Sequence, residues 1–338
     1  MDQFSILSLD GGGIRGVFVA GLLARIEERN GIRIAEHFDL IAGTSTGGIV
    51  ALGLGLGFSA REIVEFYRDN AEVIFPSVLP KWARRLPGAG FLEPRNSWAL
   101  FRRKFSSEPL ERALRQVLGA DRVLGDSTTR LVITAMDARQ HGVKLFKTAH
   151  APGLNSDWKI PAWMVAAATS AAPTYFPAAK VDNRLFYDGG LWANNPVMVG
   201  VTEALGVLDI KPSVLRVLSI GTLDQVRRFQ PRLATGGRLR WGVALVHEMM
   251  DGQSSCALGQ AKLLVGKENL VRVSPPVAAD QYAMDDASTV DDLLAESAHH
   301  ADHHARDIER IFLSRRAPRF TPNHGAPTDG RPPLRRAA

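Results

Sequence analysis

Residues 38–50 read FDLIAGTSTGGIV, and this stretch decides the fold. Its apolar first part predicts a strand over Phe38–Ala42, its glycines predict a sharp turn over Gly43–Gly47, and the apolar run that follows predicts a helix over Gly48–Leu56. A glycine turn between a strand and a helix is typical of a parallel sheet covered by helices. Such a turn also lifts Ser45 out of the fold, because its glycine flanks leave the hydroxyl unshielded.

The same order of strand, glycine cluster and helix occurs once before in the chain. Residues 4–9 predict a strand, glycines follow at 11–13, and a helix is expected from Gly16 to Arg29. The remaining pattern predicts strands over 131–137, 144–148, 214–221 and 270–273, and helices over 59–75, 107–118, 241–264 and 290–314. The sequence therefore predicts an α/β fold with a mostly parallel central sheet.

Composition limits the remaining possibilities. The 338 residues have ordinary globular composition, with 45% hydrophobic residues, and no run of about 20 apolar residues that could span a membrane. A lone cysteine, Cys256, and a start that reads as a strand favour a reducing, cytoplasmic location. The net charge of +6 favours anionic partners. We expect one domain over residues 1–315, a Trp- and Arg-rich candidate lid or regulatory insert over 76–107, and a disordered, basic, Pro-rich tail over 316–338.

The first glycine cluster, Asp10–Gly16, has two chemical interpretations. Gly11, Gly13 and Gly16 match the G-x-G-x-x-G pattern of a dinucleotide site, which would make the chain an NAD-type oxidoreductase. That interpretation needs an acid at the end of the next strand, whereas Asp39 lies at its start. Alternatively, the consecutive glycines expose backbone N–H groups that stabilise the oxyanion formed when a serine attacks an ester. A purely structural turn is the third alternative.

A nucleophilic serine needs a base, and the nine histidines offer no good candidate. None follows a strand late in the chain as a hydrolase triad requires, and the group His299, His300, His303 and His304 is more typical of a solvated helix face than of a metal site. Asp188 is a better candidate, because it follows an apolar strand and precedes Gly189 and Gly190, so that no side chain separates it from a neighbour. Burial would raise its proton affinity. Taken alone, Asp-Gly-Gly is a common turn.

Together these segments resemble the patatin-like phospholipases. The resemblance rests on four stretches that occur in family order, namely Asp10–Gly16, Gly43–Gly48, Ala167–Pro177 and Asp188–Pro196. It implies a three-layer α/β/α fold and hydrolysis of lipid acyl esters by a Ser–Asp dyad, without a cofactor or metal.

The resemblance also assigns roles by matching position. It implies that Ser45 is the nucleophile and Asp188 its base. It implies an oxyanion hole built by the glycine loop, with the loop fixed by one arginine and with the two turns supported by their flanking residues; these are Gly11, Gly12 and Gly13 for the hole, Arg15 for the loop, and Gly43, Gly47, Gly189, Gly190, Asn194 and Asn195 for the turns. The Ala-rich stretch 166–177 would pack beneath the site.

The part of the chain after Gly221 resembles a narrower group. Its long helix over 241–264 followed by a short strand is similar to bacterial patatin-type effectors of antiphage systems, in which a cyclic nucleotide switches on degradation of the cell's own membrane. The resemblance implies a phospholipid membrane surface as substrate, a cyclic nucleotide as activator, a homo-oligomer on activation, and peripheral association with the inner face of the membrane. No nucleic-acid polymer is expected as a partner.

Overall fold

The computed structural model describes residues 2–77, 103–226, 231–279 and 281–323. Its first part contains strands and helices in the order β1 (Phe4–Leu9), α1 (Gly16–Asn30), β2 (Leu40–Gly43), α2 (Thr46–Gly55), α3 (Ala60–Ile74), α7 (Glu108–Leu118), β3 (Arg130–Asp137), β4 (Gly142–Lys147), α8 (Ala162–Thr169), β5 (Ala179–Val181) and β6 (Arg184–Asp188). The candidate lid over 76–107 lies mostly outside the described residues.

The second part completes the same sheet. It contains α9 (Gly190–Ala193), α10 (Val197–Gly206), β7 (Leu215–Ile220), β8 (Asp224–Val226), α11 (Pro231–Ala234), α12 (Arg238–Val265), β9 (Leu270–Val273), β10 (Pro276–Ala278) and α13 (Val290–Ile308), which continues as a π-helical turn over Glu309–Leu313. The main sheet has the order β5-β6-β3-β2-β1-β7-β9, with β4 also paired to β3. Strands β3, β2, β1, β7 and β9 are parallel, so their carboxyl ends meet at one edge.

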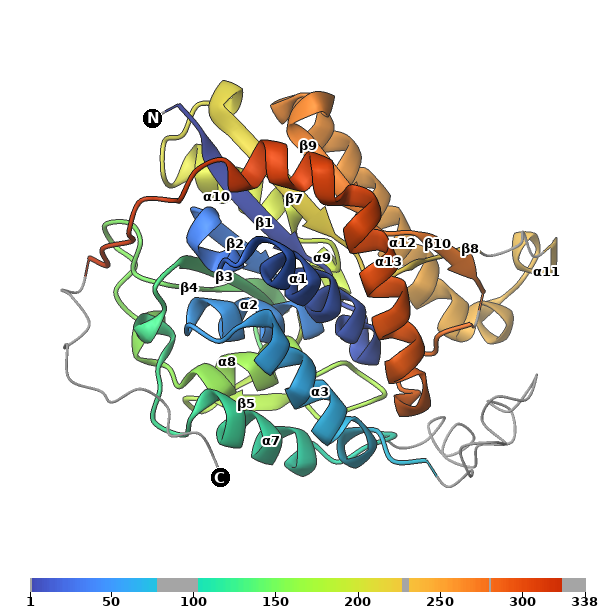
Figure 1. Ribbon diagram of the computed structural model, residues 1–338. Helices are drawn as coiled ribbons and strands as arrows, with labels where there is room; N and C mark the ends of the chain where they lie inside the picture. The colour runs from blue at the N-terminus through green and yellow to red at the C-terminus, as the bar shows by residue number, and fades with distance from the viewer. Residues whose placement is uncertain (1, 78–102, 227–230, 280, 324–338) are drawn as a thin grey trace.

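Helices cover both faces of the sheet. Along β1, Leu7 and Leu9 belong to the larger hydrophobic cluster, whereas Phe4 and Ile6 belong to the smaller one, because successive side chains of a strand point to opposite faces. Figure 1 shows α1, α2, α3 and α13 on the near side of the sheet and α10 and α12 behind it. The predicted three-layer α/β/α fold with a mostly parallel sheet is confirmed.

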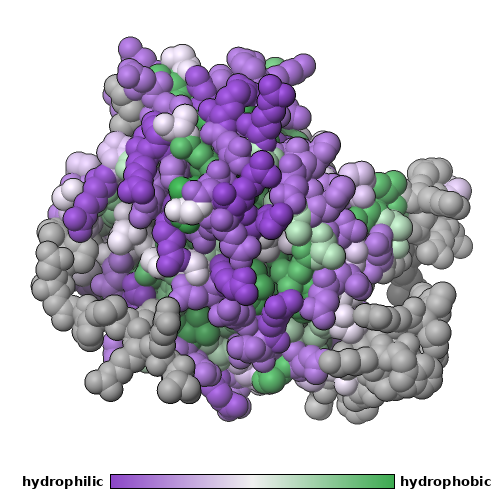
Figure 2. Space-filling view, viewed as in Figure 1, coloured by the Kyte–Doolittle hydropathy of each residue, from purple (hydrophilic) through white to green (hydrophobic). Residues whose placement is uncertain are grey.

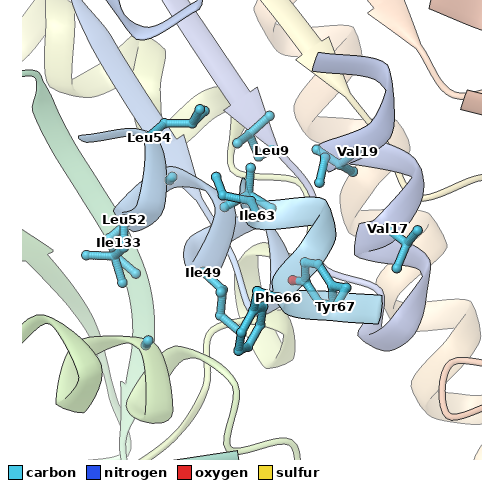
Figure 3. Close-up of a cluster of buried hydrophobic side chains, with 14 of the residues drawn as sticks. Leu9, Val17, Val19, Ile49, Leu52, Leu54, Ile63, Phe66, Tyr67 and Ile133 are labelled. Carbon is cyan, nitrogen blue, oxygen red and sulfur yellow. The ribbon is translucent and has the colours of Figure 1, made fainter. Parts of the chain in front are cut away.

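The near layer has a polar outer surface and an apolar inner one. Figure 2 shows that hydrophilic residues predominate on the visible face. Arg25 and Arg29 of α1 form ion pairs with Asp302 of α13. On the inner side, Figure 3 shows Leu9 of β1, Ile49 of α2 and Phe66 of α3 in one buried cluster. Burying side chains of this size stabilises the fold by about 1.5–3 kcal/mol each. This cluster anchors α2, the helix that follows Ser45.

Three sequence expectations need correction. The second strand begins at Leu40, because Ile34–His37 forms a 3-10 turn and the Phe38 ring stacks on Phe312 at 5.5 Å. A further strand, β10, follows the last one predicted, 270–273, and pairs with β8 in a separate two-stranded sheet. A three-residue strand that begins with proline carries too little pattern to be predicted. The helix expected over 290–314 changes at Ile308 into the π-helical turn.

The disordered tail was expected over 316–338, but the first residues of this segment contact the domain. Ala317 N donates to the Glu36 carbonyl and Asn323 N to the Ala149 carbonyl. The Phe320 ring is buried and lies against the Arg130 guanidinium, 5.3 Å from it. Residues 317–323 therefore pack on the domain, while the expected tail over 324–338 lies outside the described residues. Among the described residues, no helix combines the length and the apolar character needed to cross a bilayer.

Candidate active site

Ser45 lies on a strained turn between β2 and α2. Its φ and ψ are 54° and −124°, a conformation that L residues adopt only where the surrounding structure holds them, at a cost of about 1–3 kcal/mol. The turn is tight because a β-carbon on Gly47 would lie 2.2 Å from the Leu9 carbonyl oxygen, and one on Gly43 would lie 2.6 Å from the Gly47 carbonyl oxygen. Ser45 is half-buried between fully buried neighbours. The turn thus exposes one hydroxyl at the carboxyl edge of the sheet.

Asp188 ends β6 and meets that hydroxyl. Ser45 Oγ donates to Asp188 Oδ2 at 2.7 Å, across 143 residues of sequence. The other carboxylate oxygen, Oδ1, accepts from Gly190 N at 2.7 Å, and Asp188 N donates to the Ala171 carbonyl at 3.0 Å. Burial raises the pKa of Asp188 to about 6, and the hydrogen bonds from Gly190 and Ser45 oppose this rise. The arrangement is a hydroxyl in contact with an oriented carboxylate of increased basicity.

A threonine ladder ties the two turns together. Thr44 Oγ1 donates to the Ala193 carbonyl at 2.6 Å and accepts from Thr134 Oγ1 at 2.8 Å. Ser45 N donates to Thr169 Oγ1 at 2.8 Å, so the last residue of α8 holds the Ser45 turn in place. All three threonines are buried. Besides their own hydrogen bond, these threonine contacts therefore help to hold the Ser45 and Asp188 turns in place.

The glycine loop after β1 lies directly beside the serine. A β-carbon on Gly11 would lie 3.1 Å from the Ser45 β-carbon. However, Gly11 N donates to the Asn194 carbonyl at 3.0 Å, so this amide cannot also bind an oxyanion. Within the described residues, the amides of Gly12 and Gly13 donate to no backbone carbonyl. The expected three-amide oxyanion hole is thus reduced to two candidates.

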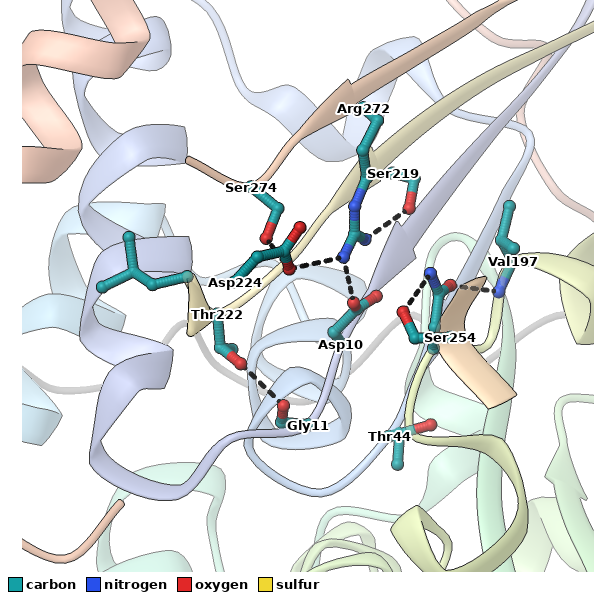
Figure 4. Close-up of polar contacts among 12 residues, drawn as sticks. Asp10, Gly11, Thr44, Val197, Ser219, Thr222, Asp224, Ser254, Arg272 and Ser274 are labelled. Atoms are coloured by element: carbon teal, nitrogen blue, oxygen red, sulfur yellow. Dashed lines mark hydrogen bonds and ion pairs between the residues drawn. The ribbon is translucent and has the colours of Figure 1, made fainter. Parts of the chain in front are cut away.

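Residues from the second half of the chain hold this loop. Thr222 Oγ1 donates to the Gly11 carbonyl at 2.7 Å, as Figure 4 shows. Gly13 has φ 59°, and a β-carbon there would lie 2.2 Å from the Met284 carbonyl oxygen, which accepts from Ile14 N at 2.8 Å. Arg15, as expected, contacts the loop: its Nε donates to the Gly12 carbonyl at 3.3 Å. The loop is therefore held between its own Arg15 and two residues of the second half, Thr222 and Met284.

Comparison with known proteins identifies the fold and the motif set. The model of the patatin-like phospholipase family matches residues 7–201, which include both turns and the glycine loop. The chain belongs to the patatin-like phospholipase family. A cGAMP-activated phospholipase of Vibrio cholerae is 35% identical over 323 residues, covering 85% of this chain and 86% of the relative. A protein of the same name from Escherichia coli is 36% identical over 249 residues, covering 70% and 66%. Patatin-like protein 4 of Arabidopsis thaliana is 34% identical, covering 59% of this chain and 51% of its own.

The alternative of an NAD-type oxidoreductase is wrong. Membership of the patatin-like phospholipases excludes it, and the geometry gives the physical reason. A dinucleotide site needs the acid at the carboxyl end of β2, whereas Asp39 precedes that strand at its amino end. There its Oδ2 accepts from Ser5 N at 2.7 Å and forms an ion pair with Arg315. The Asp39 carboxylate is therefore used in the fold, far along the strand from the glycine loop.

The residues expected to support the Asp188 turn contact several different elements. Gly189 lies against Thr134, and Asn194 contributes its carbonyl to Gly11. Asn195 is 1% exposed and connects the turn to α12: its N donates to Gln253 Oε1 at 3.1 Å, its Nδ2 to Ser254 Oγ at 3.2 Å, and its carbonyl accepts from Gln253 Nε2 at 3.1 Å. The long helix of the second half therefore contacts the segment that follows Asp188, which the sequence pattern did not indicate.

The first turn of α2 is fixed from the other side. The Tyr67 hydroxyl of α3 forms a short hydrogen bond with Thr46 Oγ1, and burial raises the pKa of this phenol. Figure 3 shows Tyr67 within the same cluster as Ile49, which lies one helical turn after Ser45. Within the described ranges, no group of three or more His, Cys, Asp or Glu side chains could hold a metal ion, the helix with His299 and His300 included.

Sequence reasoning missed one charged residue of the site. Arg272 of β9 forms an ion pair with Asp10, the residue before the glycine loop, with Nη2 2.7 Å from Asp10 Oδ2. Both residues are nearly enclosed. Arg272 lies in a four-residue strand, 262 positions after its partner. Its neighbours in the sequence do not distinguish it from an ordinary surface arginine, so the sequence does not predict the contact.

Proposed function

We propose that this patatin-like phospholipase hydrolyses acyl esters of membrane phospholipids with Ser45 as nucleophile and Asp188 as base. One observation carries the proposal: Ser45 Oγ donates at 2.7 Å to a buried carboxylate from a turn at the edge of the sheet. Holding the pair in contact turns proton transfer into an intramolecular step. The raised pKa of Asp188, about 6, brings the base closer to neutral operating pH.

The reaction proceeds in two balanced halves. Ser45 Oγ attacks the acyl carbon while its proton passes to Asp188, and the amides of Gly12 and Gly13 stabilise the negative oxygen. Asp188 then gives the proton to the leaving oxygen, which releases the lysolipid and leaves an acyl ester on Ser45. Water attacks this ester, gives its proton to Asp188, and the collapse returns the proton to Ser45 as the fatty acid leaves.

Fatty-acid release from mixed phospholipid vesicles tests the dyad. Ser45→Ala and Asp188→Asn should each lower the rate by at least about 1000-fold while thermal stability stays similar, because both groups act as one unit. Ser255→Ala and Asp182→Asn, at exposed positions, are the matched controls and should keep full activity. Hydrolysis that persists in either dyad variant would contradict the mechanism.

We further propose that a cyclic dinucleotide activates the enzyme. Relatives from Vibrio cholerae, Escherichia coli and Pseudomonas aeruginosa are named cGAMP-activated phospholipases. Degradation of the cell's own membrane after such a signal would serve antiphage defence. Hydrolysis should therefore rise when cGAMP is added, and other cyclic dinucleotides test selectivity. Light scattering in the same samples tests whether activation assembles a homo-oligomer. Equal rates with and without every nucleotide would reject the activation.

We also propose that α12 brings the site to the inner membrane surface. Gln253 of α12 contacts Asn195 beside the catalytic turn, and the same helix face continues one and two turns earlier as Met249, Val246 and Leu245, which are 61%, 47% and 46% exposed. Exposed apolar residues beside a lipid hydrolase site favour contact with a bilayer. Replacing all three with serine should weaken vesicle binding and lipid hydrolysis but leave hydrolysis of a soluble short-chain ester unchanged. Equal vesicle binding would reject this contact.

A further inference from the structure

Arg272 reaches the glycine loop from the edge strand β9. Besides its ion pair with Asp10 Oδ2, its Nη1 donates to Ser219 Oγ of β7 at 2.9 Å, and its Nη2 lies 3.6 Å from Asp224 Oδ1. Figure 4 shows the guanidinium between these three side chains, next to the end of β1. Asp224 is itself held by Ser274 Oγ at 2.6 Å. Residues of β7 and β8 therefore hold the guanidinium in place, in addition to its ion pair with Asp10.

The path of this side chain is built into the backbone. A β-carbon on Gly221 would lie 2.5 Å from Arg272 Nη2, so the absence of a side chain there leaves the guanidinium room to pass. Asp10 is tied to the same strand, because its N donates to the Ile220 carbonyl at 3.0 Å. Asp10 thus connects β7 and Arg272 to the first residue of the glycine loop.

General stability does not explain this ion pair well. Removing two charges from water is costly, and replacing a buried pair by apolar residues is often neutral or stabilising. Burial raises the pKa of Asp10 to about 6 and Arg272 opposes the rise, so the arginine keeps the carboxylate charged. An ionised Asp10 alone, one residue before Gly11, would disfavour a second negative charge at the loop, and the guanidinium offsets that repulsion.

We propose that Arg272 is a positioning residue for ester hydrolysis: through Asp10 it fixes the glycine loop for the developing oxyanion and neutralises the charge that precedes it. The inference rests on the proposed hydrolase function. Because oxyanion contacts form in the transition state, loosening them lowers kcat and leaves substrate binding almost unchanged. A merely structural arginine would instead lower the folded fraction.

Steady-state kinetics on a soluble short-chain ester test this role, together with thermal unfolding. Arg272→Gln should lower kcat by about 10- to 100-fold with KM changed less than about twofold, as expected for a loop displaced by about 1 Å. Arg272→Lys, which keeps the charge, should recover part of the loss. Arg216→Gln is the matched control, because Arg216 lies on β7 near the opposite end of the sheet, where it bonds carbonyls of residues 213 and 215. It should leave kcat unchanged.

A double variant tests whether the arginine acts through Asp10. The kcat of the double variant Asp10→Asn/Arg272→Gln should be no lower than that of Arg272→Gln alone. If the arginine acts only through Asp10, removing Asp10 as well causes no further loss. Unchanged kcat in Arg272→Gln, a loss confined to KM, or a loss that matches the unfolded fraction would overturn the proposal. If Arg272→Gln does not fold, kcat and KM of Asp10→Asn are measured instead. A lower kcat with almost unchanged KM is expected, and an unchanged kcat would reject the role. A wild-type chain that cleaves no ester contradicts the proposed function instead.

Discussion

The Thr44 hydroxyl donates to the Ala193 carbonyl at 2.6 Å and so joins the turn of the nucleophile to the turn of the base. Neither residue takes part in the chemistry proposed for Ser45 and Asp188. The bond lies one residue before the serine and five residues after the aspartate, so it sets the separation of the two reacting groups. The position of the Asp188 turn thus depends on a buried side chain that follows β2, two strands away from β6 in the sheet.

Thr44→Val should lower both stability and activity. The variant leaves the Ala193 carbonyl and the Thr134 hydroxyl without this partner, and we expect a loss of about 1–3 kcal/mol in the free energy of unfolding. We expect kcat to fall by about 10-fold, because the two turns are no longer tied. Urea unfolding and ester kinetics measure both. Thr202→Val, at an exposed position of α10, is the control and should change stability by less than about 0.5 kcal/mol.

The activity should depend on pH through Asp188. The base must be ionised to accept the Ser45 proton, and burial raises its pKa to about 6. The value of kcat/KM should therefore be constant at neutral pH and fall about tenfold per pH unit below the pKa. Asp10 has a similar raised pKa, so the profile of Asp10→Asn is needed to assign the inflection. An inflection that disappears in this variant would assign the titration to Asp10 and not to the base.

Gly47→Ala should disrupt the nucleophile turn. The added carbon would lie 2.2 Å from the Leu9 carbonyl oxygen and 2.6 Å from that of Asp10, and neither backbone atom can move without shifting the glycine loop. We expect a loss of at least about 3 kcal/mol in the free energy of unfolding and no measurable hydrolysis. Gly206→Ala, at the end of α10 with no atom within 4 Å of the added carbon, should be tolerated. Normal stability of Gly47→Ala would show that the turn has room for a β-carbon and would contradict this prediction.

Gln253→Ala should reduce turnover through the catalytic turn. The side chain accepts from Asn195 N and donates to the Asn195 carbonyl, so its loss frees the backbone seven residues after Asp188. We expect kcat to fall by about 3- to 10-fold with little change in KM. Gln260→Ala removes the same side chain from an exposed position of the same helix and should have no effect. Equal kcat values for Gln253→Ala and Gln260→Ala would show that the contact of α12 with Asn195 does not affect turnover.

The sequence predicts the fold and the meeting of the two turns because their signals are local. Glycines at 43 and 47 mark a turn that only a strand-to-helix connection requires, and Asp188 followed by two glycines marks the second turn. These stretches also carry the resemblance to patatin-like phospholipases. The contact between Ser45 and Asp188 then follows from the topology, which places β2 and β6 on either side of β3.

The contacts that refine the site carry no such signal. The Gly11 amide is occupied by the Asn194 carbonyl. Every residue has a backbone carbonyl, so this contact cannot be predicted from residue types. Arg272, Thr222 and Gln253 are common residues whose partners lie elsewhere in the chain. The packing of Phe320 was missed for a related reason, since a single aromatic residue in a Pro- and Arg-rich stretch does not outweigh its composition.

The strand order has a consequence for synthesis of the chain. Translation delivers Ser45 and Asp188 first, whereas Arg272 and the Met284 carbonyl, which brace the glycine loop, leave the ribosome about 85 to 95 residues after the aspartate. A nascent chain that ends before β9 thus holds the reacting pair without its braced loop. Under the proposed mechanism, efficient ester hydrolysis is therefore expected only after β9 and Met284 have been synthesised.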